Sequence, residues 1–341
     1  MVRRPLVPAF DSESVLLGEV LDQQVELLRE AQRAGGPVAA QVLHGTGLSD
    51  QQPGPLTRET AQLAVARDHG YADWAAAREQ AGLVVDTRFE AAADAIQWGQ
   101  LAALRDLLDT HPALTAMRSP FPHHAMLLHH VAANGIEVER QLQSPPTAPQ
   151  IMRLLLERGA EPDALCDTYR GGRTQTTLVL LVSSCVPAAA GVQGALVEEL
   201  SRGGAQVNGL DDDGAPLWTA VSFGYTEAAE ALVGCGARVD NIVFHAALGD
   251  VAAVRGYFGA DGQLKPAQLR IGATGPELPA AHLADYALIQ AAGHGRREVV
   301  EFLLGRHPDL SVTEPFFGAT ARGAAEHQGY IEIAALIEAR A

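Results

Sequence analysis

Apolar residues follow a helical spacing in short segments along most of the chain, and glycines separate these segments. The segment from Ala215 to Asp240 shows the pattern most clearly, because it contains two short apolar faces. These faces consist of Ala220, Val221, Ala228, Ala231, Leu232 and Val233. Gly224 lies between the faces and Gly236 follows the second, where chain reversal and a left-handed helix end favour a residue without a Cβ atom. Each predicted helix has about two turns and is too short to be stable alone in water. The segment therefore predicts a helix–turn–helix unit that folds by stacking on similar units.

Similar units occur elsewhere in the chain. Three segments share a paired aliphatic helix end, a Gly-Ala pair, two spacer residues and then Asp or Asn. They are Ile151–Asp163, Val197–Asn208 and Ala229–Asp240. Five further segments fit half of the unit or more: Ala92–Pro112, Met126–Gly135, Phe244–Phe258, Tyr286–Pro308 and Gly318–Ala339. The chain is therefore predicted to be a helical repeat array.

The repeated segments resemble the ankyrin repeat. Met126–His129 (MLLH) and Ala215–Trp218 (APLW) stand where that family has Thr-Pro-Leu-His. The glycines Gly204 and Gly236 are 32 residues apart, close to the ankyrin period of ~33 residues. The resemblance covers roughly residues 89–341. It implies an all-α ankyrin-repeat solenoid with about six or seven degenerate repeats in residues 85–341.

Residues 1–84 are predicted to form a separate helical cap over the first repeat. An amphipathic helix is expected up to Ala34, with Asp11 or Ser12 as its N-cap, and a second short helix is expected at residues 37–43. Residues 57–82 resemble the small helical leader that precedes ankyrin arrays in many bacterial proteins. Thr57 and Thr60 are candidate N-caps there, and Tyr71 and Trp74 are expected to pack beneath the leader helices.

Four insertions interrupt the repeat pattern. They lie at residues 136–150, 165–175, 183–193 and 259–281. Long loops in compact domains are often functional, so the clustering of three insertions in the second and third units favours a composite site there. The alternative is an elaboration without a role in binding.

The charge of the chain narrows the class of partner. With 41 acidic and 25 basic residues, the formal net charge is −16, which disfavours nucleic acid or an anionic membrane as the main partner and is compatible with a basic protein. Cys166, Cys185 and Cys235 match no disulfide framework or metal-binding spacing. The N-terminus lacks the apolar region of a secretory signal, and no apolar run reaches the ~20 residues of a membrane span. A cytoplasmic location is expected.

No catalytic, metal or cofactor motif is present. The sequence contains no GxSxG, HExxH or GxGxxG pattern. The adjacent pairs His123-His124 and His129-His130 do not converge as zinc ligands do, and the ankyrin resemblance gives His129 a structural role. Residues 211–214 lack the ligand spacing of an EF-hand. We therefore expect no metal, no cofactor and no catalytic residues.

The resemblance implies a protein-binding scaffold that uses its hairpin tips and concave groove. The expected partner contacts at the hairpins are Arg118, Phe121, His123, His124, Tyr169, Arg170, Asp212 and Asp213. The expected groove contacts are His130, Trp218, Ser222 and Phe223, and Trp218 is alternatively a core residue. The competing interpretation is a small-molecule site or enzyme between the insertions of units two and three, in a pocket lined by His130, Tyr169 and Ser184.

Overall fold

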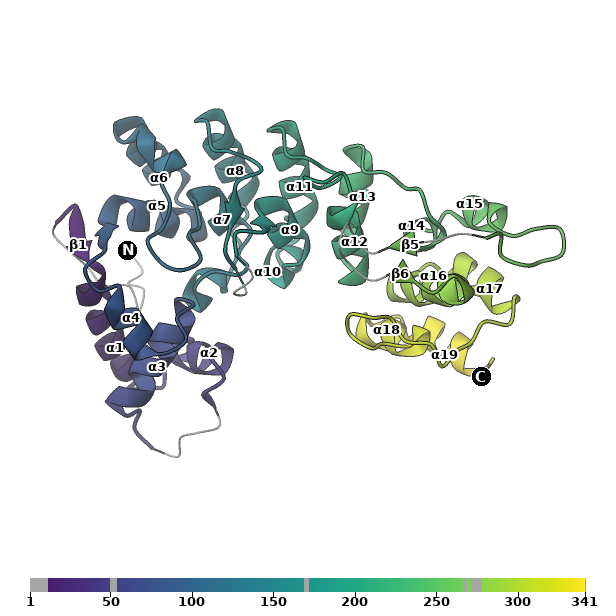
Figure 1. The fold of residues 1–341 in the computed structure, drawn as a ribbon, viewed down its shortest axis with the longest axis horizontal. Coiled ribbons are helices and arrows are strands. Elements are labelled where there is room, and N and C mark those ends of the chain that lie inside the picture. The colour runs from purple at the N-terminus through teal and green to yellow at the C-terminus, as the bar shows by residue number, and fades with distance from the viewer. Residues whose placement is uncertain (1–11, 50–53, 169–171, 267–268, 271–276, 341) are drawn as a thin grey trace. The chain divides into compact units, whose positions relative to one another are not determined.

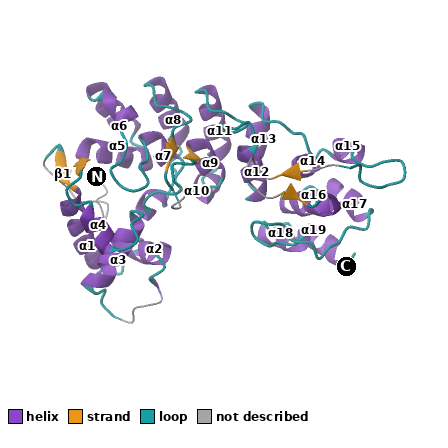
Figure 2. Cartoon of the chain, viewed as in Figure 1, coloured by secondary structure: helices purple, strands orange, loops and turns teal. Residues whose placement is uncertain are grey.

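The fold is all-α, as predicted, and consists of short helices that pair and stack (Figures 1 and 2). The computed structural model describes residues 12–49, 54–168, 172–266, 269–270 and 277–340. The chain divides into two compact units, Met1–Val192 and Gln193–Ala341, so the residues predicted as an N-terminal cap belong to the first unit. None of the described helices combines the length and the apolar character needed to cross a bilayer.

Four helices and one strand pair form the leader of the first unit. The helices are α1 (Leu17–Arg33), α2 (Pro37–Gly45), α3 (Arg58–Asp68) and α4 (Trp74–Glu79). The strands β1 (Ser14–Leu16) and β2 (Val84–Asp86) pair in an antiparallel arrangement, with Val15 opposite Val85. The leader core consists of buried aliphatic side chains from α1, α2 and α3, with Tyr71 buried and Trp74 packed at its edge, as expected.

The predicted start of the first helix is wrong. Asp11 lies outside the described residues, and Ser12 precedes β1 rather than a helix. The helix begins only at Leu17, because Val15 is buried against Val85 in the strand pair. Thr57 caps α3 as predicted, since its hydroxyl accepts a hydrogen bond from the Thr60 backbone N–H at 3.2 Å. Thr60 itself lies within α3.

The remaining elements of the first unit form helical hairpins with insertions. The helices are α5 (Thr87–Gln97), α6 (Leu101–Thr110), α7 (Leu127–Val131), α8 (Ala148–Glu157), α9 (Thr177–Val182) and α10 (Cys185–Ala189). Short 3-10 helices occur at η2 (Pro112–Ala116) and η3 (Val138–Gln141), and the strands β3 (Leu165–Cys166) and β4 (Gln175–Thr176) pair as a hairpin. The insertions at 136–150 and 183–193 thus contain η3 and α10.

The second unit begins with α11 (Gln193–Arg202), and four helix pairs follow it along the chain. The pairs are α12 (Ala215–Ser222) with α13 (Thr226–Gly234), α14 (Ile242–Leu248) with α15 (Val251–Gly256), α16 (Leu283–Gly293) with α17 (Arg297–Leu304), and α18 (Ala321–His327) with α19 (Ile331–Glu338). The insertion at 259–281 contributes β5 (Leu269–Arg270), β6 (Glu277–Leu278) and the start of η4 (Ala280–His282). First helices pack on first helices (α14 on α16, α16 on α18), and second helices on second helices (α15 on α17, α17 on α19). This packing of successive helix pairs is that of a helical repeat solenoid.

The glycines act as the sequence predicted. Gly224, between α12 and α13, has φ +75°, and Gly236, after α13, has φ +98°. Both angles lie in the left-handed region, which other residues adopt only at a cost. A Cβ atom on Gly224 would also displace the end of the Gln328 side chain, but the left-handed φ is the main reason for glycine in this turn.

Candidate functional site

Three of the predicted partner contacts in the first unit are buried, so the expectation that they form an exposed surface is wrong. Phe121 is 1% exposed and stacks on the His69 ring, with ring centroids 3.9 Å apart. His123 is 5% exposed, and its Nε2 donates to Glu137 Oε1 at 3.1 Å. His130 is 4% exposed and meets the Phe89 ring edge-on. These side chains stabilise the first unit and are not available to a partner.

Two other predicted contacts of the first unit, Arg118 and His124, are described and half-buried. Arg118 is half-buried and donates from Nη1 to the carbonyl oxygens of His124 and Leu165, at 2.9 and 2.7 Å, so it ties one hairpin to the next. His124 is half-buried and has φ +48°. Tyr169 and Arg170 lie outside the described residues.

His129 has the structural role that the resemblance implied. Its Nδ1 accepts from the Met126 backbone N–H at 3.0 Å, and its Nε2 donates to the Ala164 carbonyl at 2.8 Å. Burial lowers the pKa of His129 to about 4, so the ring is neutral near pH 7.

A buried charge network, which the sequence did not reveal, joins the leader to the repeats within the first unit. Arg140 lies in the insertion at 136–150, and its Nη2 is 2.5 Å from Glu90 Oε2 and 3.1 Å from Asp94 Oδ1, both on α5. Glu137 contacts both Arg140 and His69. Its Oε2 is 3.6 Å from Arg140 Nη1, and its Oε1 is 3.4 Å from His69 Nδ1. Burial alone would raise the pKa of Glu137, but Arg140 and the neighbouring imidazoles hold it well below its usual value.

The leader is attached through the same insertion. Asp68, at the end of α3, accepts a hydrogen bond through Oδ1 from the Val138 backbone N–H at 2.9 Å. The Val138 side chain packs against the leader core. The only sequence signal for these contacts is the opposite charge of Glu137 and Arg140, three residues apart on a predicted insertion. The insertion therefore has a structural role in the first unit.

A cavity of about 590 Å³ adjoins this insertion but differs from the pocket expected between units two and three. It is lined by the ends of α2 and α3, by Pro122 and His123, by residues of the insertion, and by Asp167 and Thr168. His130 and Ser184 do not line it. Ser184 instead donates its hydroxyl to the Ala133 carbonyl at 3.1 Å. In the described part of the chain, no three His, Cys, Asp or Glu side chains are placed to hold a metal ion.

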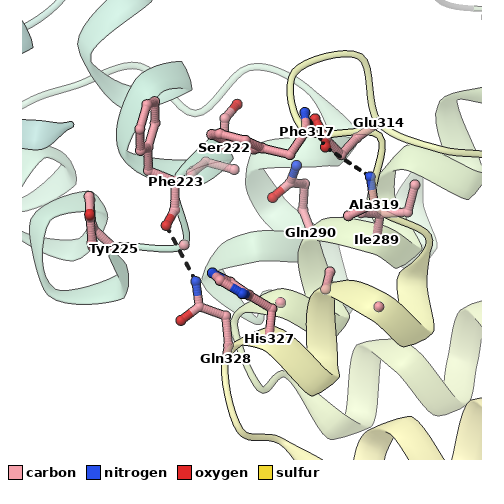
Figure 3. Close-up of a pocket in the computed structure, with 15 residues that line it drawn as sticks. Ser222, Phe223, Tyr225, Ile289, Gln290, Glu314, Phe317, Ala319, His327 and Gln328 are labelled. Carbon is pink, nitrogen blue, oxygen red and sulfur yellow. Dashed lines mark hydrogen bonds between the residues drawn. The ribbon is translucent and has the colours of Figure 1, made fainter. Parts of the chain in front are cut away.

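The second unit contains a cavity of about 390 Å³ that unites two of the predicted groove residues, Ser222 and Phe223 (Figure 3). Four segments build it: the end of α12, the second half of α16, the loop at residues 314–319, and α18. The lining residues are Val221, Ser222, Phe223, Gly224, Tyr225, Ile289, Gln290, Gly293, Glu314, Phe317, Ala319, Gly323, Ala324, His327 and Gln328. The sequence placed the first segment at a groove but gave no signal that α16 and α18 complete it.

The loop at 314–319 presents an aromatic ring at the cavity. The Glu314 carboxylate accepts backbone N–H groups from Phe316 and Phe317, both at 2.7 Å, and from Ala319 at 3.2 Å. These bonds fix the loop with Phe317 61% exposed. The Phe317 ring meets the Phe223 ring at nearly a right angle, with centroids 5.1 Å apart. The two rings form an apolar wall that water reaches.

The end of α12 is held in place by later helices of the same unit. His294, which caps α16, donates from Nε2 to the Val221 carbonyl at 2.9 Å and pairs through Nδ1 with the Thr226 hydroxyl at 2.7 Å. Gln328 donates from Nε2 to the Phe223 carbonyl at 3.3 Å, as Figure 3 shows. The cavity is therefore a fixed feature of the packing, which reduces the ordering cost of binding.

Two polar side chains of the cavity lack partners among the described residues. Gln290 is 7% exposed, and its amide makes no hydrogen bond there. The Ser222 hydroxyl is buried and also makes none. Buried polar groups are normally hydrogen-bonded, so the lack of a partner for the Ser222 hydroxyl is unusual, whereas the Gln290 amide faces the open cavity (Figure 3). An amide that is both donor and acceptor, next to a hydroxyl, suits a ligand with the same two functions.

The remaining predicted contacts of the second unit lie outside this cavity. Asp212, at φ +54°, forms an ion pair with Arg238, and Asp213 accepts the Ala215 backbone N–H at 2.9 Å. Trp218 is 6% exposed and packs on Phe244, with centroids 5.6 Å apart. Trp218 is therefore a core residue, which was the alternative left open by the sequence.

Acid is expected to weaken the second unit through His294. Burial lowers the pKa of His294 to about 4, below the 6.5 of an exposed histidine. The unfolded chain then binds a proton that the folded chain does not, so stability falls as the pH drops from 6.5 towards 4, by up to about 3 kcal/mol. Hydrogen exchange of α16 amides, corrected for intrinsic rates, measures this loss. His294→Gln should be less stable at pH 7 and show a shallower pH dependence. An equal slope in both proteins would contradict the assignment.

Comparisons with known proteins give little further information about the function of this site. No protein-family model matches the chain, and no curated protein is significantly similar to it. Among solved structures, the chain is similar to the crystal structure of the human ASB11 ankyrin repeat domain, at 19% identity and a TM-score of 0.38. The match covers 73% of this chain and 97% of that domain. Nothing about partners or activity follows from a likeness at this level.

Proposed function

We propose that the chain is a protein-interaction scaffold and that its second unit binds an extended peptide segment of a partner protein in the 390 Å³ cavity. The observation that supports this most is the combination of a water-accessible aromatic wall with the unpartnered amide of Gln290 in one preformed cavity. Its volume falls in the range of ~300–1,000 Å³ typical of ligand sites.

A peptide satisfies both kinds of surface in the cavity. Its backbone amide offers one N–H and one C=O, which match the two functions of the Gln290 side chain. One apolar side chain would contact Phe223 and Phe317 above a floor of small residues, which are Gly293, Gly323 and Ala324. Burial of one such side chain contributes about 1.5–3 kcal/mol.

Charge favours a basic segment around this anchor. The net charge of −16 attracts a cationic partner over long distances and repels an acidic one. The proposed partner segment therefore carries an apolar anchor residue flanked by Lys or Arg. His327 and Gln328, both exposed at the cavity, provide further polar contacts at its rim.

Selection from a random displayed peptide library, with the full chain as bait, tests the proposal. Peptides selected by the wild type should share an apolar anchor with basic neighbours. Their affinity for Ala324→Leu, which fills the floor, and for Gln290→Leu, which removes the amide, should fall at least about tenfold, the equivalent of about 1.4 kcal/mol.

The matched control is Ala335→Leu, which adds the same side chain to an exposed position of α19 outside the cavity. This variant should bind the selected peptides as the wild type does. Thermal unfolding of each variant shows that the fold is retained. Selected peptides that bind Ala324→Leu and Gln290→Leu undiminished would exclude the cavity as the binding site.

A further inference from the structure

Two exposed arginines of the second unit are held by aromatic rings instead of by carboxylates. Arg255, at the end of α15, lies over the Phe302 ring of α17, with its Cζ 5.0 Å from the ring centroid. Arg306, just after α17, lies over the same ring at 4.8 Å and over the Phe258 ring at 5.1 Å. The two rings meet edge to face, with centroids 5.5 Å apart. The four side chains form one cluster, which we call the Arg–Phe cluster.

Neither arginine of the cluster has a counter-ion among the described residues. Five described arginines of the second unit form ion pairs with Asp or Glu; they are Arg202, Arg238, Arg296, Arg297 and Arg322. Neither Arg255 nor Arg306 forms an ion pair with any described residue, although the chain has a large excess of acidic residues. Arg255 and Arg306 are distinguished by the ring that they share, since both guanidinium groups lie over Phe302.

Stacking on the rings prepares both guanidinium groups for an anion. A guanidinium on an aromatic ring keeps its N–H donors in its own plane and free at the edge, and the contact restricts its side-chain rotamers. Both Cζ atoms lie near the same Phe302 ring, so they are within about 10 Å of each other. A tetrahedral anion that binds both groups would therefore lie at the edge of the Phe302 ring, where N–H donors of both guanidinium groups can reach it.

The insertion at 259–281 adds a third cation beside them. Lys265 is exposed, and its Nζ donates to the Gly256 carbonyl at 2.6 Å, next to Arg255 in the chain. Lys265 also forms no ion pair with a described residue. The turn that precedes Lys265 approaches Arg306 closely, since a Cβ atom on Gly262 would lie 2.9 Å from Arg306 Nη1.

We infer that the Arg–Phe cluster, with Lys265, binds a phosphate monoester. Three cations without counter-ions call for a ligand of more than one negative charge, and a phosphate monoester carries about −1.5 to −2 at pH 7. Its oxygens accept bidentate hydrogen bonds from arginine, whereas a single carboxylate would neutralise only one of the three cations. The site shares no residue with the cavity proposed for the peptide, so a negative result for one proposal does not affect the other.

Titration followed by 31P NMR tests this site with two probes on the full chain. The probes are inorganic phosphate and a blocked pentapeptide with a central phosphoserine, and the unphosphorylated peptide is the negative probe. Both phosphate probes should bind with a Kd in the millimolar range or below. Binding should weaken as salt rises from 0.05 to 0.5 M, because the site is exposed. Tighter binding of the phosphopeptide would identify a protein as the source of the phosphate, and equal binding would identify a free phosphate metabolite.

Matched variants locate the binding. Arg306→Gln and Arg255→Gln should each weaken phosphate binding at least tenfold, and Arg306→Lys should weaken it as well, because lysine lacks the planar fork. Arg297→Gln is the control, since Arg297 lies on the same helix α17 but is paired with Glu301. The inference is overturned if no phosphate probe binds at 20 mM, or if Arg297→Gln lowers the affinity as much as Arg306→Gln does.

Discussion

Replacement of Arg140 by methionine is expected to lower the free energy of unfolding of the first unit by about 3–5 kcal/mol. Arg140 is 5% exposed and faces Glu90, Asp94 and Glu137. Methionine retains apolar volume but leaves the buried Glu137 and the partly buried Glu90 and Asp94 without this counter-charge. Hydrogen exchange of the slowest amides in α5, followed by mass spectrometry, measures the loss for this unit alone.

The control is an exposed ion pair of the same unit. Arg78 lies 3.1 Å from Asp22, and both side chains are nearly half exposed. Arg78→Met should therefore cost less than about 1 kcal/mol. The double variant Glu137→Gln/Arg140→Met should cost less than the sum of its single changes, because the two groups interact directly. Similar small losses for Arg140→Met and Arg78→Met would show that the buried network does not stabilise the unit.

Replacement of Asp68 by asparagine is expected to stabilise the first unit at pH 8 and to have little effect at pH 4. Burial raises the pKa of Asp68 to about 6, above its ordinary 3.8, against the opposing effect of His69. The folded chain then holds a proton that the unfolded chain releases, so stability falls as the pH rises from 3.8 to 6 and stays reduced above that. Asparagine removes the charge and keeps an acceptor for the Val138 N–H, which predicts a gain of about 1–3 kcal/mol at pH 8.

The pH dependence of the difference is the deciding result. The gain for Asp68→Asn, measured by hydrogen exchange of α3 amides, should vanish between pH 6 and pH 4. Asp109→Asn, at an exposed position of α6 paired with Arg158, should change stability by less than about 1 kcal/mol at both pH values. A constant gain, or a loss at pH 8, would mean that the charged Asp68 carboxylate does not destabilise the folded unit.

The repeat architecture could be predicted because its signals are local. The alternation of aliphatic pairs with glycines such as Gly224 and Gly236 depends on residues within one helix–turn–helix unit. The N-cap of α3 at Thr57 and the structural His129 depend on contacts over a few residues and one neighbouring hairpin. Local chemistry of this kind is readable from a single sequence.

The site residues were harder to predict because they depend on contacts between distant segments. The pairing of β1 with β2 joins residues about 70 positions apart. Because of it, α1 begins later in the chain than the sequence predicted. The burial of Phe121 and His123 follows from their packing against the leader and the insertion at 136–150. Ser222 and Phe223 were placed at a groove, but only the fold brings Gln290 and Phe317 to the same cavity.

Methyl NMR of the full chain with a selected peptide tests the central claim, that the cavity of the second unit binds the partner. The methyl groups of Val221, Ile289 and Ala324 line the cavity, whereas those of Ile151 and Leu155 are buried in α8 of the first unit. Our account predicts saturable shift changes and peptide-to-protein nuclear Overhauser effects at the three cavity residues. Unchanged cavity methyls at peptide saturation, with contacts elsewhere on the chain, would contradict it.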